Sequence, residues 1–380
     1  MTALQVPTLI AERLAKARSL MHVHGLDYIM VGPSADLYYL TGARSHTSER
    51  MTLFILPQEG PASIVVPGFE AALLPPLGDE IQVKTWGERD NPARLAALQI
   101  ASAANHSPGG FSCTIGASDQ LWSVFLLRLQ AELPRATFTS ASTVLSALRQ
   151  IKSADEVENL RTSGEAADAV FAEIIERPFI GRTEAEIGQE IVDGLKARGL
   201  EVPGHAIVAS GPNSASPHHH TGSRRIEAGD AIVLDFGGTV GGYYSDITRT
   251  VFAGRAPEPG SEETHVYGLV AAAQQSAFEA ARPGMTCEDL DSVARSLLEA
   301  AGYGEFFNHR LGHGIGLDGH ELPYLVSGNT AQLQPGMAFS LEPGLYLPGK
   351  FGIRIEDIVV LEQAGARRMN NADRGIVVVQ

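Results

Sequence analysis

The stretch 231-AIVLDFGGTVGGYYSDITRT-250 decides the fold, because it sets two acidic residues inside apolar, β-branched runs joined by a glycine-rich turn. Asp235 and Asp246 are unusual in such runs, since a carboxylate without a partner is costly to bury. If the chain folds back between Val240 and Gly241, the two aspartates lie opposite each other on one face of a β-hairpin. The stretch therefore predicts a hairpin that presents a pair of carboxylates.

A second segment, 340-SLEPGLYLPGKFGIRIEDIVV-360, repeats this pattern. Glu342 and Glu356 are equally distant from Gly349, which lies in the Pro-Gly turn signal LPGK. His313 lies between the two segments, in the glycine-rich stretch RLGHGIGLDGHE, which we expect to form a loop that can approach closely. Four carboxylates and one imidazole in this arrangement suggest a shared cation, with enough ligands for two divalent ions bridged by carboxylates and a water.

Each carboxylate taken alone has a simpler explanation, because it could cap a turn or pair with an arginine such as Arg249 or Arg354. The ordered set of five favours metal binding instead. Ligation by many oxygens and one imidazole suits a hard or borderline divalent ion, of which Mn²⁺ is the first choice and Co²⁺ or Zn²⁺ can substitute. Two such ions can lower the pKa of a bridging water and generate hydroxide near neutral pH.

The order Asp, Asp, His, Glu, Glu, within the strings ASGPNSASPHH, GHGIGLDGHE, SLEPGLY and RIED, resembles the metallopeptidase family with the pita-bread fold. That family includes prolidase (Xaa-Pro dipeptidase), aminopeptidase P and methionine aminopeptidase. The resemblance is strong over residues 151–379 and weaker over residues 1–150, where it implies a smaller domain of the creatinase and prolidase type. It implies that the metal ligands are Asp235, Asp246, His313, Glu342 and Glu356.

The resemblance also implies catalytic roles for three residues. Glu342 would both bind metal and carry the proton to the leaving amine; the alternative is a ligand without a proton role. His320, seven residues after His313, matches a histidine that stabilises the tetrahedral oxyanion. His218, seventeen residues before Asp235, matches a histidine that contacts the substrate.

His309 and Arg354 are further candidates for the substrate site. His309 joins His218 and His320 as a substrate-binding histidine by resemblance. Arg354 either positions a carboxylate ligand or holds the C-terminal carboxylate of a short peptide.

Four other residues receive weaker assignments. His219 and His220 have no counterpart in the family and are interpreted as bystanders. Tyr39 and Arg44 could close one end of the cleft, although packing or surface roles are the favoured interpretation for both.

Composition excludes several classes of protein. A chain of 380 residues, 44% apolar and 19% charged, indicates a soluble globular protein of two domains, expected at residues 1–150 and 151–380. Its net charge of −15 argues against binding nucleic acid. We expect no membrane span and no secretory signal, and Cys113 and Cys287 are too few for a disulfide framework. The expected location is the cytoplasm.

The pattern of helices supports two domains of mixed α/β class. A capping box formed by Ser153 and Glu156 is expected to open a helix over residues 154–175, just after the domain boundary. A second helix is expected over 184–198, and a further pair over 265–282 and 287–301. The C-terminal region thus reads as helix pair, hairpin, helix pair, hairpin, which suits a pseudo-twofold fold. The resemblance implies that this is the pita-bread fold, with a metal site between its halves.

The candidate ligands and the resemblance together predict a cytoplasmic metallopeptidase, expected as a homodimer. It is expected to cleave Xaa-Pro dipeptides by attack of a metal-bridged hydroxide. Proline calls for a dedicated enzyme, because its tertiary amide and fixed φ do not fit sites that read a backbone N–H. The nearest alternative is an enzyme like aminopeptidase P, which removes the first residue from longer Xaa-Pro-Xaa peptides. An alternative from another class is a metal-free hydrolase like creatinase, or a binding protein that has lost catalysis.

Overall fold

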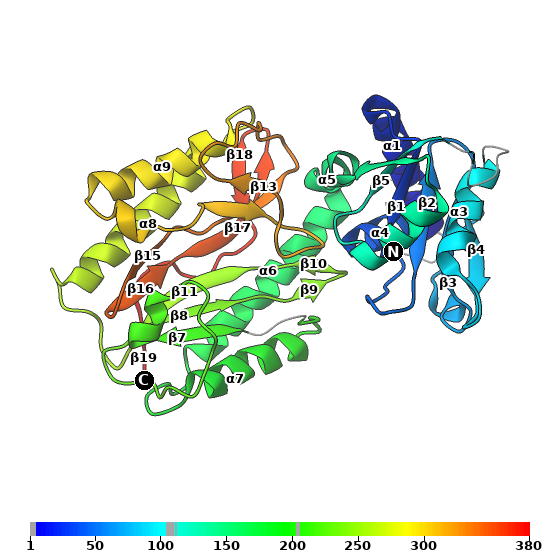
Figure 1. The fold of residues 1–380 in the computed structure, drawn as a ribbon. Coiled ribbons are helices and arrows are strands. Elements are labelled where there is room, and N and C mark those ends of the chain that lie inside the picture. The colour runs from blue at the N-terminus through cyan, green and yellow to red at the C-terminus, as the bar shows by residue number, and fades with distance from the viewer. Residues whose placement is uncertain (1–4, 104–109, 111, 203–205) are drawn as a thin grey trace. The chain divides into compact units, whose positions relative to one another are not determined.

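The computed structural model describes residues 5–103, 110, 112–202 and 206–380 (Figure 1). It divides into two compact units, residues 1–149 and residues 150–380. In the part of the chain that is described, no helix is long and apolar enough to cross a membrane.

The first unit is a mixed sheet with helices. Its strands, in the sheet order β4-β3-β2-β1-β5-β6, combine parallel and antiparallel pairs. The strands are β1 (Tyr28–Val31), β2 (Leu53–Pro57), β3 (Ala62–Pro67), β4 (Ile81–Trp86), β5 (Thr114–Ala117) and β6 (Thr137–Ser140). The α-helices are α1 (Gln5–His24), α2 (Ala35–Thr41), α3 (Pro92–Ala103), α4 (Ser123–Glu132) and α5 (Ser142–Gln150). The α/β class expected for this region is therefore observed.

Tyr39 and Arg44, for which the sequence left open a place at the cleft, have local contacts inside the first unit. The Tyr39 hydroxyl donates to the carbonyl of Leu148 at 3.1 Å, and the side chain is buried beneath the Arg13 guanidinium. Arg44 lies over the ring of Tyr38. Packing thus accounts for Tyr39, as the favoured interpretation of the sequence had it.

The second unit contains two helix pairs. These helices are α6 (Ala154–Ile174), α7 (Glu184–Ala197), α8 (Glu262–Ala280) and α9 (Cys287–Ala300). The capping box of Ser153 and Glu156 is present at the start of α6, and Thr183 and Thr286 cap α7 and α9 in the same way. Because a cap satisfies backbone N–H groups that have no partner within the helix, these residues fix where each helix begins.

A nine-stranded sheet forms the body of the second unit, in the order β13-β12-β14-β17-β11-β8-β7, with β18 beside β17 and β19 beside β11 (Figure 1). Its strands are β7 (Ile207–Ser210), β8 (Ala231–Phe236), β11 (Ile247–Ala253), β12 (Gly312–Gly314), β13 (Glu321–Leu325), β14 (Ala338–Leu341), β17 (Glu356–Glu362), β18 (Gly365–Arg368) and β19 (Val377–Val379). Two short pairs extend it: β9 (Thr239–Val240) with β10 (Tyr243–Tyr244), and β15 (Gly344–Leu347) with β16 (Phe351–Arg354).

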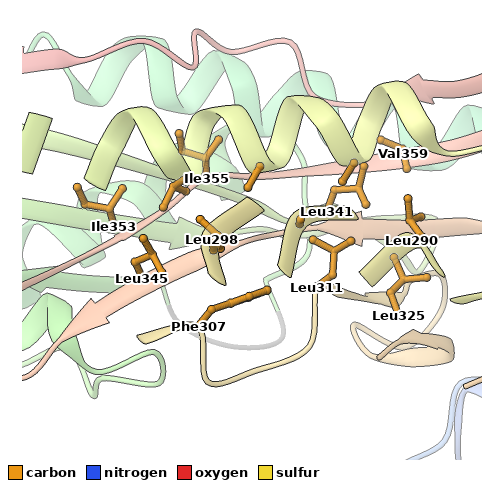
Figure 2. Packing of buried hydrophobic residues seen from close by; sticks show 14 of the residues in the cluster. Leu290, Leu298, Phe307, Leu311, Leu325, Leu341, Leu345, Ile353, Ile355 and Val359 are labelled. Carbon is orange, nitrogen blue, oxygen red and sulfur yellow. The ribbon is translucent and has the colours of Figure 1, made fainter. Parts of the chain in front are cut away.

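Each helix pair covers its own part of the sheet. Helices α6 and α7 share a buried apolar cluster with β7, β8 and β11. Helices α8 and α9 share another with β14 to β17, seen in Figure 2 where Leu290 and Leu298 of α9 face Leu341 and Leu345. The expected repeat of helix pair and strands is therefore present, and its two clusters hold the central strands in place.

The first hairpin differs from its expected register. Asp235 pairs with Thr248, not with Asp246, because the two-residue turn is Gly241-Gly242. Both glycines have positive φ, 58° and 86°, as this type of tight turn requires. Asp246 lies two residues before Thr248, so both aspartates still share one face of the sheet.

The second hairpin has the expected register. Leu341 pairs with Asp357 and Gly344 with Arg354, so the pairing is centred on Gly349, which has a positive φ of 73°. His313 departs from expectation, because it lies on the short buried strand β12 and not in a loop. β12 is held between β13 and β14, which accounts for the difference.

Gly237 tests the close packing of the first hairpin. A Cβ at this position would lie 1.9 Å from the carbonyl oxygen of Ser245. We expect Gly237→Ala to destabilise the protein by about 1–3 kcal/mol, the usual range for overpacking. Gly268→Ala in α8 is the matched control, because nothing lies within 4 Å of its Cβ and alanine favours helices. Equal unfolding temperatures for the two variants would contradict this packing.

Candidate metal centre

All nine residues expected in the site line one cavity of about 380 Å³ in the second unit. They are Asp235, Asp246, His313, Glu342, Glu356, His218, His309, His320 and Arg354. The five expected ligands come from five adjacent strands in the order β12-β14-β17-β11-β8, at or beside their ends. Residues more than one hundred positions apart in the chain therefore meet at one place on the sheet.

Ligand atoms of Asp246, His313 and Glu356 lie within 4.8 Å of one another, close enough to hold one cation. Glu342 joins this group, because its Oε1 is 3.2 Å from the Nε2 of His313. The Nδ1 of His313 is 3.0 Å from the carbonyl oxygen of Gly314, which can only accept, so Nδ1 carries the proton. Nε2 is thereby left free to bind a metal ion.

Glu356 shows most directly that the site fits a cation. Its Oε2 accepts a hydrogen bond from the Thr248 hydroxyl at 2.7 Å. Its Oε1 is buried and has no hydrogen-bond partner among the described residues. A buried carboxylate oxygen without a partner is strongly unfavourable unless a cation satisfies it.

Electrostatics lead to the same conclusion. Burial, followed by repulsion from Asp235 and Glu342, raises the pKa of Asp246 well above its usual value. Burial and neighbouring carboxylates raise the pKa of Glu356 in the same way. Burial also raises the pKa of Glu342 to about 7, although Arg354 opposes the shift. Carboxylates this close together need positive charge to remain ionised at neutral pH.

Arg354 supplies part of that charge from the protein itself. Its Nη2 donates to Asp235 Oδ2 at 2.5 Å, its Nε to the Thr248 hydroxyl at 3.1 Å, and its Nη1 to the Tyr346 hydroxyl at 2.7 Å. A further bond reaches the carbonyl of Pro217 at 3.3 Å. These contacts favour the first of the two expected roles, in which Arg354 positions a carboxylate ligand.

The three cavity histidines other than His313 have different surroundings. His320 stacks on His313 with ring centroids 3.7 Å apart. His309 has both ring nitrogens engaged, Nδ1 with the Arg310 carbonyl at 2.8 Å and Nε2 with the Tyr346 hydroxyl at 3.1 Å. His218 is exposed toward the cavity, and no described residue forms a hydrogen bond with its ring. Of these three histidines, His218 and His320 are the two whose ring nitrogens form no hydrogen bond with the described residues.

His219 corrects an expectation from the sequence, because it is not a bystander. Its Nε2 lies 2.8 Å from Oε2 of Glu184, whose side chain is completely buried. No local sequence pattern indicates this contact, because Glu184 lies 35 positions earlier in the chain, at the start of α7. His220 is exposed, as expected of a surface residue.

Sequence reasoning missed Tyr346 and Arg310, which also line the cavity. Tyr346 could have been found, because a turn at Gly349 places it on the same face as Arg354. Arg310 lies over the ring of Tyr324 at 4.1 Å, and its guanidinium forms no ion pair or hydrogen bond with any described residue. No pattern in the sequence distinguished Arg310 from other arginines.

Comparison with known proteins gives the class of this site. Residues 158–363 match the model of metallopeptidase family M24, and residues 13–151 match that of the creatinase/prolidase N-terminal domain. The chain therefore belongs to metallopeptidase family M24, and the expected pita-bread class is confirmed. Membership of this family implies divalent metal, and Asp246, His313 and Glu356 form a group that could hold an ion.

Individual relatives are similar over nearly the whole chain. A probable dipeptidase PepE of Mycobacterium bovis is 40% identical, covering 97% of this chain and 96% of its own. A Xaa-Pro dipeptidase of Pyrococcus horikoshii is 31% identical, covering 96% of this chain and 99% of its own. The crystal structure of dipeptidase PepE from Mycobacterium ulcerans has a TM-score of 0.90 and 39% identity, covering 98% of both chains.

The raised carboxylate pKa values predict a specific pH dependence. The pKa of Glu342 is about 7 in the folded protein against 4.5 ordinarily. Below both values the group is protonated in the folded and unfolded states. Between them the unfolded chain ionises first, so Glu342 should make the metal-free protein lose stability as the pH rises from about 4.5 to about 7. Burial lowers the pKa of His309, His313 and His320 to about 4, which acts in the opposite direction, so the contribution of Glu342 is measured against a variant that lacks it.

Thermal unfolding of the chelated protein across this pH range measures the effect. Added Mn²⁺ should offset the loss, and its stabilising effect should grow with pH, because it binds the ionised carboxylates of the folded state. Glu342→Gln is the matched control, and the unaltered metal-free protein should lose stability relative to this variant as the pH rises. A difference between the two metal-free proteins that does not change over this pH range would contradict the assignment.

Proposed function

We propose that this metallopeptidase binds two divalent ions and hydrolyses Xaa-Pro dipeptides. The observation that carries the proposal is the buried, unpartnered Oε1 of Glu356 among converging ligands from five strands. The proposed ligands are Asp235, Asp246, His313, Glu342 and Glu356. When bound, the two ions would activate a water molecule and polarise the scissile carbonyl.

Two residues of the chain are proposed to act on the reacting atoms. Glu342 would move a proton from the attacking water to the leaving proline nitrogen; a pKa raised to about 7 suits a group that both accepts and gives up a proton. His320 would donate a hydrogen bond to the oxyanion, because it lies against His313 with a free ring nitrogen.

The substrate's two ends are proposed to meet different parts of the cavity wall. Arg354 uses four of its five N–H groups on protein atoms, so its proposed role is to position Asp235 rather than to bind a peptide carboxylate. Arg310 lines the same cavity with a guanidinium free of such bonds to the described residues, and it would hold the C-terminal carboxylate of a dipeptide. His218 would contact the substrate from the opposite half of the sheet, and His309 would shape the wall through Tyr346.

The identity of the metal and the setting of the enzyme complete the proposal. Mn²⁺ is the proposed ion, since four carboxylates and one imidazole suit it; Co²⁺ or Zn²⁺ would substitute. Cys113 and Cys287 are both buried and unpaired, which agrees with a reducing cytoplasm. We also expect a homodimer, which sedimentation of the purified protein would show.

The choice of substrate gives the most informative assay. Protein supplied with Mn²⁺ should hydrolyse a Xaa-Pro dipeptide faster than the same sequence extended at its C-terminus, and exhaustive chelation should abolish both activities. Arg310→Gln should slow hydrolysis of the dipeptide but not of the extended peptide, and so bring the two rates closer together. Faster cleavage of the extended peptide would indicate an enzyme like aminopeptidase P. Full activity after chelation would refute the metal mechanism.

The two stacked histidines should respond differently to substitution. His320→Ala should lower kcat by roughly 10²–10³-fold while the metal content stays normal, since only a transition-state contact is lost. His313→Ala should lose bound metal together with activity, because it removes a ligand. Kinetics and elemental analysis of both variants decide the assignment. A near-normal kcat for His320→Ala would leave His320 as a structural residue.

A further inference from the structure

Glu184 is a completely buried acidic residue outside the metal centre, at the first position of α7. Its Oε1 accepts hydrogen bonds from the Ser210 backbone N–H at 2.8 Å, the Ser210 hydroxyl at 2.7 Å and the Asn213 side-chain amide at 2.9 Å. Its Oε2 accepts from Nε2 of His219 at 2.8 Å and from the backbone N–H of Gly222 at 3.3 Å. One carboxylate therefore binds both ends of the segment 210–222.

These bonds require Glu184 to be ionised. Burial alone would raise its pKa, but hydrogen bonds from Asn213, Ser210 and His219 outweigh burial and lower the pKa. An ionised carboxylate only accepts, so Nε2 of His219 must carry a proton. The start of a helix also favours negative charge, because its backbone N–H groups point outward there.

The segment 210–222 reaches the cavity at its middle. The Ser214 hydroxyl accepts a hydrogen bond from the backbone N–H of Gly352 at 2.7 Å, which fixes the segment on β16. The Pro217 carbonyl accepts from Arg354 at 3.3 Å, next to the bond from Arg354 to Asp235. His218 follows directly and lines the cavity, so its backbone is held on both sides.

His218 itself has no such support for its side chain. Its ring is exposed and forms no hydrogen bond with the described residues, so its direction depends on the backbone of the segment. His219 is the adjacent residue and is anchored to Glu184. His218 lies in a turn that is closed by a hydrogen bond from the His219 backbone N–H to the Ser216 carbonyl at 3.2 Å, so the anchor at His219 also fixes the backbone that carries the His218 ring.

We propose that Glu184 and His219 are positioning residues that aim His218 at the substrate. This inference rests on the proposed function, because it takes His218 to contact a peptide in the cavity. Neither residue touches the reacting atoms; each acts through the backbone of the segment 210–222. The string SGPNSASPHHH thus contains one histidine for the substrate and one for the scaffold.

A double-mutant cycle with His218 tests the proposal. His219→Ala should lower kcat/KM for a Xaa-Pro dipeptide by roughly 10- to 100-fold, the effect of misplacing a contact by about 1 Å. His218→Ala combined with His219→Ala should be no worse than His218→Ala alone, because the second change acts only through the first. His219→Gln keeps an N–H donor and should recover most of the activity.

Two further comparisons separate positioning from general damage. His220→Ala is the matched control, since this neighbour is exposed, and it should leave kcat/KM unchanged. The metal content of His219→Ala should equal that of the unaltered protein, because no ligand is removed. Glu184→Gln should reproduce the effect of His219→Ala, since a neutral amide accepts these hydrogen bonds more weakly.

Hydrogen exchange over residues 210–222 gives a readout that needs no activity. His219→Ala should exchange faster there than the unaltered protein, with no change elsewhere. Unchanged exchange, a normal kcat/KM, or additive effects of the two histidine substitutions would each overturn the proposal. If the unaltered protein cleaves no Xaa-Pro dipeptide, the proposed function fails, and the exchange result alone then decides whether Glu184 and His219 hold the segment.

Discussion

Repulsion among buried carboxylates is the constraint on which the rest of this structure depends. Asp235, Asp246, Glu342 and Glu356 line one cavity, and burial raises the pKa of the last three, so their ionisation is unfavourable without nearby positive charge. Arg354 provides one compensating charge, held by four hydrogen bonds. Glu356 still keeps a buried oxygen with no protein partner among the described residues. A divalent cation would satisfy this oxygen and the charge of the neighbouring carboxylates, so metal binding and the stability of the local fold would be energetically linked.

The fold meets this constraint by keeping the ligands on regular structure. Five adjacent strands carry the five proposed ligands at or near their ends. Two apolar clusters beneath separate helix pairs hold those strands, and one of them is shown in Figure 2. Sites built on strands hold their geometry better than sites built on loops. His218 is the exception, because it lies on an irregular segment. The buried Glu184 is accordingly placed where the scaffold would otherwise be loose.

Local signals in the sequence predicted most of the second unit. The capping box of Ser153 and Glu156 located the start of α6, and the turn at Gly349 predicted the register of one hairpin. The other hairpin was misread, because two consecutive glycines allowed neighbouring turn positions and only the folded backbone selects Gly241-Gly242. Long-range contacts were not predictable: nothing local links His219 to Glu184, or separates Arg310 from other arginines. The five proposed ligands could be singled out because they break the apolar strand pattern, and the structure brings them to one cavity.

The central claim is that these five residues hold two divalent ions. The most direct measurement is anomalous X-ray scattering from crystals of the protein grown with Mn²⁺, recorded at the manganese absorption edge. The account predicts two peaks in the cavity, one of them beside Glu356 Oε1 and Asp246. Each of the five proposed ligands should lie within bonding distance of at least one peak. Crystals with full Mn²⁺ supplementation and no anomalous peak among these residues would contradict it.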